Sequence, residues 1–484
     1  MEAIGDGKLS DGIDAPVWQF WKRRRFIVVL MAFLGFTNLY TMRINLSVAI
    51  VAMTENRTVL LDDGSVEHEQ SFDWSSSEQG HVLSSFFYGY LLTQIPGGYL
   101  SDKLGGNNVL GAGIGLTAIL TLFMPLAAHG GIGWLIGLRV LQGMCEGVAF
   151  PCMHNVWSKW APPFERSRMV MCSFAGVFVG TILAMMVSGI LATALNWESI
   201  FYVFGAIGCL WCVAWFLVVS RSPEQDRFIT SSEKEYILKS IGRIEGDSRK
   251  IKHPWKAIFT SKPVIAATVS NFAENWSFYF LLTQLPTFLK EAMHFEVQTT
   301  GFIAALPYAA MGLSLGIAGY LADWFQVKGI LTTTQVRRNF NCIAFVAQTV
   351  FMILGVVILE PIPTIICITI AVAMGSLAWC GYAVNSLDLS PKSAGVLMGI
   401  SNSAGTIAGI CSPIVTGYIT TEGTDEEWQL VFYIAAVIYL VGLFVYWFWA
   451  SGELQPWSIE MQEMAAKEKD LSQNRAAYDN KVSE

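Results

Sequence analysis

The stretch GYLSD at Gly98–Asp102 recurs as GYLAD at Gly319–Asp323, and this repeat indicates that the chain is built from two similar halves. A second landmark follows in each half, because Ala175–Gly176 matches Ala404–Gly405. In both halves the first landmark ends the second apolar segment, and the second landmark lies in the fifth. Two halves with matching landmarks are typical of secondary transporters, whose membrane folds contain internal repeats.

The chain around this repeat is too apolar for a soluble protein. Of its 484 residues, 53% are hydrophobic and 14% are charged, whereas soluble domains carry about 25% charged residues. A membrane helix needs about 20 mostly apolar residues. Twelve stretches meet this requirement: 26–53, 79–101, 108–128, 134–157, 169–192, 198–220, 263–290, 300–323, 340–359, 363–385, 393–420 and 428–450. We predict an all-α integral membrane protein built from two pseudo-symmetric six-helix bundles.

The positive charges predict the orientation of these spans. Of the 31 lysines and arginines, all but Arg43, Arg57, Arg139 and Lys290 fall in segments on the same side as both termini. Because cytoplasmic loops carry the excess of basic residues, both termini are expected in the cytoplasm.

The same pattern divides the chain into domains. A polar and basic stretch separates the two sets of six spans, and it contains an amphipathic segment at 232–241. The expected parts are a cytoplasmic N-terminus at 1–25, a first bundle at 26–220, a cytoplasmic linker at 221–262, a second bundle at 263–450 and a cytoplasmic tail at 451–484. The acidic loop 54–78 then faces outward, and its sequon at Asn56 predicts glycosylation there.

Five ionisable side chains interrupt the apolar spans: Arg43, Arg139, Glu146, His154 and Glu274. A charge at the bilayer centre costs about 2.5–3.5 kcal/mol on insertion scales, so such residues usually face a cavity or a partner. We therefore take all five as candidates for a functional site.

Glu146 and His154 are the candidates for ion coupling in the first half. Pro151 lies between them, and since proline lacks an N–H, the helix is expected to bend there. A carboxyl and an imidazole that face a cavity can exchange protons, and a carboxylate can alternatively hold a cation. The competing interpretation is a structural ion pair of Glu146 with Arg139 or with Arg43.

Arg43 is the candidate contact for a substrate anion, because a guanidinium binds a planar anionic group with two parallel hydrogen bonds. The competing interpretation is a structural counter-ion. Glu274 is assigned to ion coupling, with the further hypothesis that it pairs with Arg43 across the two halves and gates access. Tyr88, Asn275 and Tyr279 are candidates for additional hydrogen bonds to the substrate.

At these residues the chain resembles the major facilitator superfamily. The stretch GYLSDKLGG is similar to that superfamily's signature between spans two and three, and RVLQG at 139–143 is similar to its span-four motif. The resemblance implies gating or structural roles for Asp102, Lys103 and Arg139, and for Asp323 in the second copy of the repeat.

Longer motifs narrow the resemblance to the anion:cation symporter family of sialin, vesicular glutamate transporters and sodium–phosphate cotransporters. These motifs are EGVAFPCMHNVWSKWAPPFERSR and LMGISNSAGTIAG. The resemblance is strongest to insect inorganic phosphate cotransporters, through SFFYGY, WKAIFTS, GYLADWFQVKGI and TTTQVRRNFNC. It implies that Arg43 contacts the anion, that Glu146 is the proton-coupling carboxylate, and that His154 tunes it.

The chain departs from the family pattern at three positions. Glu274 stands where vesicular glutamate transporters carry an arginine, which argues against glutamate loading. Ser386 replaces the histidine of an NHLD motif, and Gln142 stands where some relatives have a second acid.

The leading hypothesis is a symporter that moves inorganic phosphate or a small organic anion by alternating access, driven by Na⁺ or H⁺. One alternative is a sialin-like proton-coupled exporter of acidic sugars or acidic amino acids from lysosomes or vesicles. Another is a non-transporting receptor on the same scaffold. An enzyme is not expected, because no Ser–His–Asp arrangement, histidine-rich metal cluster or nucleotide loop stands out.

The expected partners are a small anionic solute, the coupling cation and the lipid bilayer. We expect no nucleic acid, no cofactor or bound metal beyond the coupling ion, and a monomer. The plasma membrane is favoured over a lysosomal or vesicular membrane.

Overall fold

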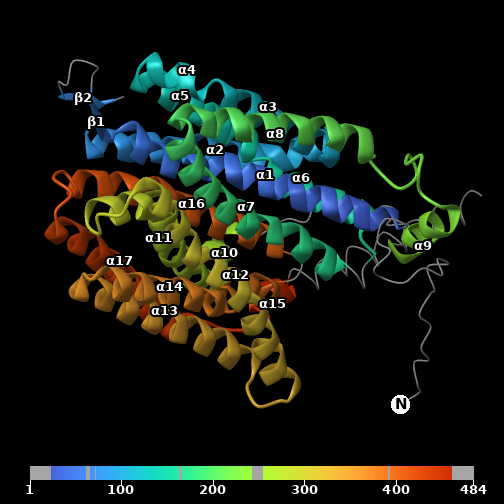
Figure 1. Cartoon of the computed structure of the whole chain (residues 1–484). Coiled ribbons are helices and arrows are strands. Elements are labelled where there is room, and N and C mark those ends of the chain that lie inside the picture. The colour runs from blue at the N-terminus through green and yellow to red at the C-terminus, as the bar shows by residue number, and fades with distance from the viewer. Residues whose placement is uncertain are drawn as a thin grey trace, which may run out of the picture. The chain divides into compact units, whose positions relative to one another are not determined.

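The computed structural model describes residues 23–60, 66–70, 72–162, 166–241, 254–390 and 393–460 (Figure 1). The described chain is helical apart from a hairpin of two antiparallel strands, β1 (Asn56–Leu60) and β2 (Val66–Gln70). The first-half and linker helices are α1 (Arg24–Met53), α2 (Ser76–Leu104), α3 (Gly106–Leu122), α4 (Met124–His129), α5 (Ile132–Glu146), α6 (Ala149–Trp160), α7 (Arg166–Ala194), α8 (Trp197–Val218), α9 (Ser231–Ile241) and α10 (Trp255–Thr260). The remaining helices are α11 (Lys262–Glu291), α12 (Val297–Val327), α13 (Thr333–Ile358), α14 (Pro361–Ala378), the π-helix η2 (Trp379–Ala383), α15 (Val384–Leu389), α16 (Ala394–Ile419) and α17 (Asp425–Trp449).

Each of the twelve predicted spans falls on one helix or on consecutive helical segments. The interrupted spans are the third (α3 and α4), the fourth (α5 and α6) and the tenth (α14, η2 and α15). Within the described residues, seven helices are long and apolar enough to cross a membrane: α1, α7 from Met169, α8, α12, α13, the run from α14 to α15, and α17. The all-α membrane fold predicted from the sequence is confirmed.

The chain packs into two compact units. The first contains the described residues of 1–245 together with 280–309 and 410–428, and the second contains those of 246–279, 310–409 and 429–484. Both halves of the sequence therefore contribute to the first unit. The bundle boundaries 26–220 and 263–450 were drawn from the sequence alone, and they stay a prediction.

Glycines set the spacing of α1 and α7 in the first unit. A Cβ atom at Gly176 would lie 2.2 Å from the carbonyl oxygen of Phe33, and one at Gly180 would lie 2.4 Å from that of Thr37. Small residues let membrane helices approach this closely. This part of the repeated landmark thus serves helix packing.

The helices α2 and α5 approach each other in the same way. A Cβ atom at Gly143 would lie 1.9 Å from the carbonyl oxygen of Phe86, and one at Gly147 would lie 2.5 Å from that of Tyr90. These two glycines, one turn apart, bring the aromatic residues of α2 against the end of α5, where Glu146 lies.

The fourth span is interrupted near Pro151, where the sequence predicts a bend. Helix α5 ends at Glu146, Gly147 and Val148 form a turn, and α6 begins at Ala149. Pro151 has no N–H to bond the carbonyl of Gly147. The interruption places Glu146 at the last position of its helix.

At the hairpin end of the first unit, helices from both halves of the sequence meet. A Cβ atom at Gly417 would lie 3.2 Å from the Cα of Gly80, and one at Gly301 would lie 3.3 Å from the Cα of Gly189. The ammonium of Lys290 pairs with the carboxylate of Glu55. This end of the first unit is therefore closed by backbone contacts between helices.

The predicted amphipathic segment 232–241 forms helix α9, which is held against the start of α1. The carboxylate of Glu233 accepts hydrogen bonds from the backbone amides of Arg24 (2.8 Å) and Arg25 (3.1 Å). It also pairs with the Arg25 guanidinium at 3.2 Å. Glu233 thus caps the first helix, because an anion is stabilised at a helix N-terminus.

The second unit has an apolar core between α11, α13, η2 and α17, which includes Ala273, Phe345, Tyr382 and Tyr439. The π-helix η2 contributes Tyr382 to this core. Its Cys380 carbonyl accepts a hydrogen bond from the Arg337 guanidinium at 3.0 Å.

Candidate functional site

Arg43 and Glu146 form a buried ion pair in the first unit. The Nε of Arg43, on α1, lies 3.0 Å from the Oε2 of Glu146, at the end of α5. Arg43 is 4% exposed and Glu146 is 1% exposed. Arg43 also donates from a terminal nitrogen to the hydroxyl of Tyr40 at 3.3 Å. Neither side chain faces lipid, as expected for a charge kept inside a membrane protein.

Three aromatic rings surround the guanidinium of Arg43. Its central carbon lies 4.6 Å from the ring centroid of Tyr40, 4.7 Å from that of Phe86 and 4.8 Å from that of Tyr90. A cation at this distance from a ring is attracted by the ring's quadrupole. The rings therefore stabilise the charge of Arg43 without neutralising it.

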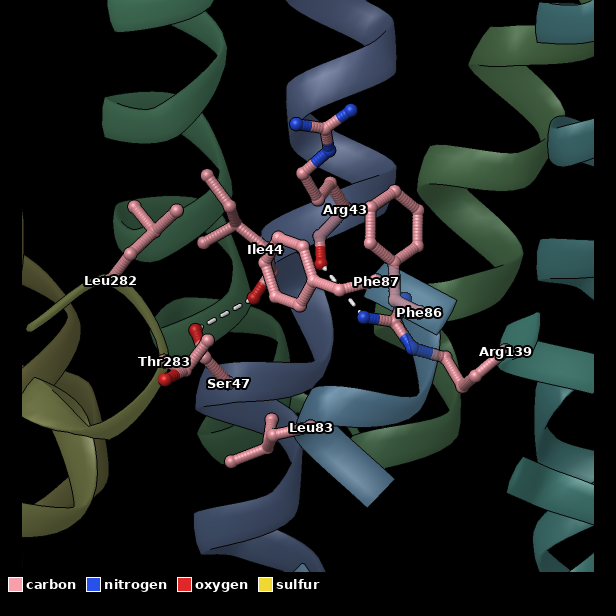
Figure 2. Close-up of a pocket in the computed structure, with 9 residues that line it drawn as sticks. All are labelled: Arg43, Ile44, Ser47, Leu83, Phe86, Phe87, Arg139, Leu282 and Thr283. Atoms are coloured by element: carbon pink, nitrogen blue, oxygen red, sulfur yellow. Dashed lines mark hydrogen bonds between the residues drawn. The ribbon is translucent and has the colours of Figure 1, made fainter. Parts of the chain in front are cut away.

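Arg139 is a second buried cation at this site. It donates to the backbone carbonyl of Arg43 at 3.3 Å (Figure 2). It also donates to the side chain of Gln142 at 3.2 Å. Its guanidinium lies 5.1 Å from the ring centroid of Phe86. Gln142 in turn donates to the hydroxyl of Thr121 at 2.9 Å. Because Arg139 also interacts electrostatically with Glu146, the site holds two cations and one carboxylate.

A small cavity lies beside this pair. It is lined by Arg43, Ile44, Ser47, Leu83, Phe86, Phe87, Arg139, Leu282 and Thr283. Figure 2 shows the guanidinium of Arg43 directed away from Ser47 and Thr283. The lining combines two guanidinium groups and two hydroxyls with apolar side chains, as is common in small-molecule sites.

Glu274 occupies a different environment in the second unit. It is 3% exposed, and its Oε1 accepts a hydrogen bond from the side-chain amide of Gln348 at 3.3 Å. In the described part of the chain, the side-chain amide of Gln348 bonds to Glu274, and the carboxylate of Glu146 pairs with Arg43. The hypothesis of an Arg43–Glu274 gate stays a prediction.

Asn275, the predicted substrate contact on α11, bonds to Asn271 on the same helix, and Asn271 bonds to α16. The side chain of Asn275 donates to the backbone carbonyl of Asn271 at 2.9 Å, and Asn271 donates to the hydroxyl of Ser401 at 2.7 Å. Tyr279 is buried, with its ring against that of Phe278. Asn275 and Tyr279 are both in the second unit.

His154 is separated from Glu146. It is exposed, and the contact that its ring makes is with Phe174, at 6.1 Å between centroids. Eight residues of helix correspond to about 12 Å of rise, and the turn at Gly147 lies between the two residues. Among the described residues no contact joins His154 to Glu146, and the tuning role that the resemblance implies stays a prediction.

Tyr88 is part-exposed on α2 and does not line the cavity. Its neighbours Phe86 and Tyr90, four residues apart and on one face of the helix, contact Arg43 instead. The sequence contained this information as the aromatic run at 86–90. Residues four apart lie on the same face of a helix, so Phe86 and Tyr90 point the same way. The sequence does not show which face of α2 is directed toward Arg43.

The gating residues are described in part. The ammonium of Lys103 lies 4.6 Å from the ring centroid of Tyr99, one turn away on the same helix. The side chains of Asn56, Asp102 and Asp323 lie outside the described residues, so their predicted roles stay predictions.

A family model and several individual proteins match this chain. The model of the Major Facilitator Superfamily matches residues 25–410, with a further match at 335–477. Vesicular glutamate transporter 2.1 of Danio rerio is 41% identical over 471 residues, which cover 94% of this chain and 80% of that protein. Sialin of Homo sapiens is 41% identical over 451 residues, which cover 90% of this chain and 91% of that protein.

Two solved structures share the fold at low sequence identity. A bacterial homolog of the human lysosomal transporter Spinster, inward-facing and unoccupied, has a TM-score of 0.70 at 15% identity and covers 90% of this chain and 99% of its own. A D-xylose–proton symporter has a TM-score of 0.65 at 14% identity and covers 89% and 99%.

Proposed function

The chain belongs to the major facilitator superfamily and, within it, to the anion:cation symporter family of sialin and the vesicular glutamate transporters, and from this premise we propose that it moves a small anion across a membrane by cation-coupled symport. It is a multi-pass membrane transporter and not an enzyme. The proposed substrate is inorganic phosphate or a small organic anion.

The observation that carries the proposal is the buried Arg43–Glu146 pair. While Glu146 is ionised, the guanidinium of Arg43 is held by its carboxylate at 3.0 Å. A proton that binds Glu146 cancels the carboxylate charge and releases the guanidinium, which then binds an oxyanion with two parallel hydrogen bonds. Protonation and anion binding therefore favour each other, which is the requirement for symport.

The surroundings of Glu146 support H⁺ rather than Na⁺ as the coupling ion. Two guanidinium groups lie around this carboxylate, and both repel a metal cation that approaches it. A proton forms a covalent bond to the carboxylate oxygen and needs no further ligands. We propose that Glu146 is the proton-binding group and that Arg43 is the anion-binding group.

Glu274 bears on the choice of anion. Glu274 is an acid at a position where an arginine would supply a positive charge for an anion. We therefore propose that Arg43 and Arg139 supply the positive charge that binds the anion. A substrate with one compact anionic group suits this arrangement better than one with two separated carboxylates. Phosphate is therefore proposed ahead of glutamate.

Alternating access is supported by the closed hairpin end of the first unit. There Gly80 meets Gly417 and Gly189 meets Gly301, with backbone atoms in close approach. Opening this end requires these helices to separate, as in rocking of one bundle against the other. We propose that the hairpin end faces away from the cytoplasm, that both termini lie in the cytoplasm, and that the protein resides in the plasma membrane.

Uptake of radiolabelled phosphate into proteoliposomes tests the proposal. With the purified full-length chain, we expect uptake driven by an imposed proton gradient and insensitive to a Na⁺ gradient. Glu235→Gln, on the exposed face of α9, serves as a control with unchanged uptake. Uptake driven by Na⁺ alone, or indifferent to both gradients, would contradict proton coupling.

The same vesicles distinguish the substrate and the alternative class. Competition by phosphate, sialate, glutamate and urate at two pH values is expected to rank phosphate first. If an anion binds but no flux is seen under any gradient, the chain is a receptor on a transporter scaffold.

A further inference from the structure

We propose that Glu274 is a second proton-binding site, which takes up and releases one proton in each transport cycle independently of Glu146. The role in the cycle rests on the proposed transport function, whereas proton binding by Glu274 does not. The step is the addition of H⁺ to the carboxylate to give the neutral acid, and no other bond changes.

In the part of the chain that the structure describes, the groups around Glu274 are neutral. The side chain of Gln348 reaches it from α13, and the backbone of Gly375 faces it from α14. The titratable groups that interact with it are the phenols of Tyr382, on η2, and Tyr439, on α17. No basic side chain in the described ranges pairs with it.

A carboxylate in such a site is unstable unless it is neutralised. Transfer of an unpaired ion into an apolar environment is far more costly than transfer of the neutral acid, and buried charges are therefore paired or lost. Glu146 meets this requirement with Arg43. Glu274, which is 3% exposed and has an amide as its partner, meets it by binding a proton.

Gln348 suits both protonation states. Its amide can donate from Nε2 to the ionised carboxylate at the observed 3.3 Å. If the amide turns over, its oxygen accepts from the protonated acid at the same place, because the two ends of the amide group have nearly the same shape. The pair thus keeps one hydrogen bond whether the proton is present or absent.

Gly375 provides the space for this exchange. A Cβ atom at position 375 would lie 2.5 Å from Oε1 of Glu274 and 3.0 Å from Nε2 of Gln348. The close approach of α14 therefore depends on glycine. Gly375→Ala displaces the carboxyl without removing it, which makes it a test of position separate from charge.

Infrared difference spectroscopy of the purified full-length protein tests proton binding without any transport. At neutral pH we expect a C=O stretching band of a protonated carboxyl that is lost in Glu274→Gln, shifted in Gly375→Ala and unchanged in the Glu235→Gln control. If Glu274→Gln does not fold, the shift in Gly375→Ala decides. A band that is identical in all variants overturns the proposal.

Two further measurements separate this proposal from its competitors. Loss of the band on addition of Na⁺ at constant pH would show a Na⁺ site instead of a proton site. In proteoliposomes, the number of protons moved per anion is expected to fall by one in Glu274→Gln, and an unchanged ratio contradicts a role in the cycle. If wild-type protein shows no transport, the proposed function fails, while the infrared result still decides proton binding.

Discussion

Two buried carboxyls, Glu146 in the first unit and Glu274 in the second, are almost equally inaccessible and yet differ in every contact. Glu146 lies at a helix end, against Arg43 and near Arg139, with aromatic rings behind the cations. Glu274 lies inside a helix, against one amide. The carboxyl of Glu146 is therefore paired with an arginine, whereas that of Glu274 has a neutral partner. Protonation of Glu146 changes the contacts of Arg43, and protonation of Glu274 changes no ion pair.

Arg43→Ala is expected to have the largest effect, because it removes the anion contact and leaves Glu146 without its partner. Breaking one side of a buried pair costs about 3–5 kcal/mol. We expect phosphate uptake to fall to background and the thermal midpoint in detergent to drop. Arg43→Lys keeps the charge without the two-pronged geometry, so it is expected to recover stability and not transport. Full uptake by Arg43→Lys would exclude a bidentate role.

Glu146→Gln and Glu274→Gln test the comparison directly. The first leaves a buried guanidinium unpaired and is expected to destabilise the protein by about 3–5 kcal/mol. The second exchanges one neutral hydrogen-bonding group for another, with an expected change within about 1 kcal/mol. Chemical denaturation in one detergent compares the two variants. Equal losses would mean that Glu274 has an ionic partner after all.

Gly143→Ala tests whether the contacts of the aromatic rings with Arg43 depend on the close approach of α2 to α5. The added methyl group would lie 1.9 Å from the carbonyl oxygen of Phe86, so the helices must separate, at a cost of about 1–3 kcal/mol. We expect lower stability together with weaker anion binding. Gly137→Ala is the matched control on the same helix, because a Cβ atom there meets nothing within 4 Å.

Glu78 is a carboxyl exposed to water, and its substitution is expected to change the stability least. Hydrogen bonds from the Ser75 hydroxyl and backbone amide lower the pKa of Glu78 below its usual value. A lowered pKa in the folded state contributes stability above the unfolded value, and this contribution is lost as the pH falls through the folded value. Glu78→Gln should therefore cost less than about 1 kcal/mol at neutral pH and nothing in acid. A cost that persists in acid would assign the effect to something other than charge.

The candidate residues differ in whether the sequence alone could identify them. Arg43, Glu146 and Glu274 were found from the sequence because a charge inside an apolar span is visible without any structure. The aromatic residues Phe86 and Tyr90 were not, since an aromatic ring is ordinary in a membrane helix. Tyr88, predicted from the same run, does not line the cavity beside Arg43, and its role as a substrate contact stays a prediction.

Hydropathy and charge are properties of each segment alone, so the helices, the internal repeat and the ionisable residues inside the spans could be predicted without a structure. The sequence left open whether Glu146 pairs with Arg139, seven residues before it, or with Arg43 on another helix. The packing of the helices pairs Glu146 with Arg43 and gives Glu274 a neutral partner. The reason is that partners across helices depend on how closely backbones approach, and this approach is set by glycines such as Gly143 and Gly375 in contact with distant parts of the chain.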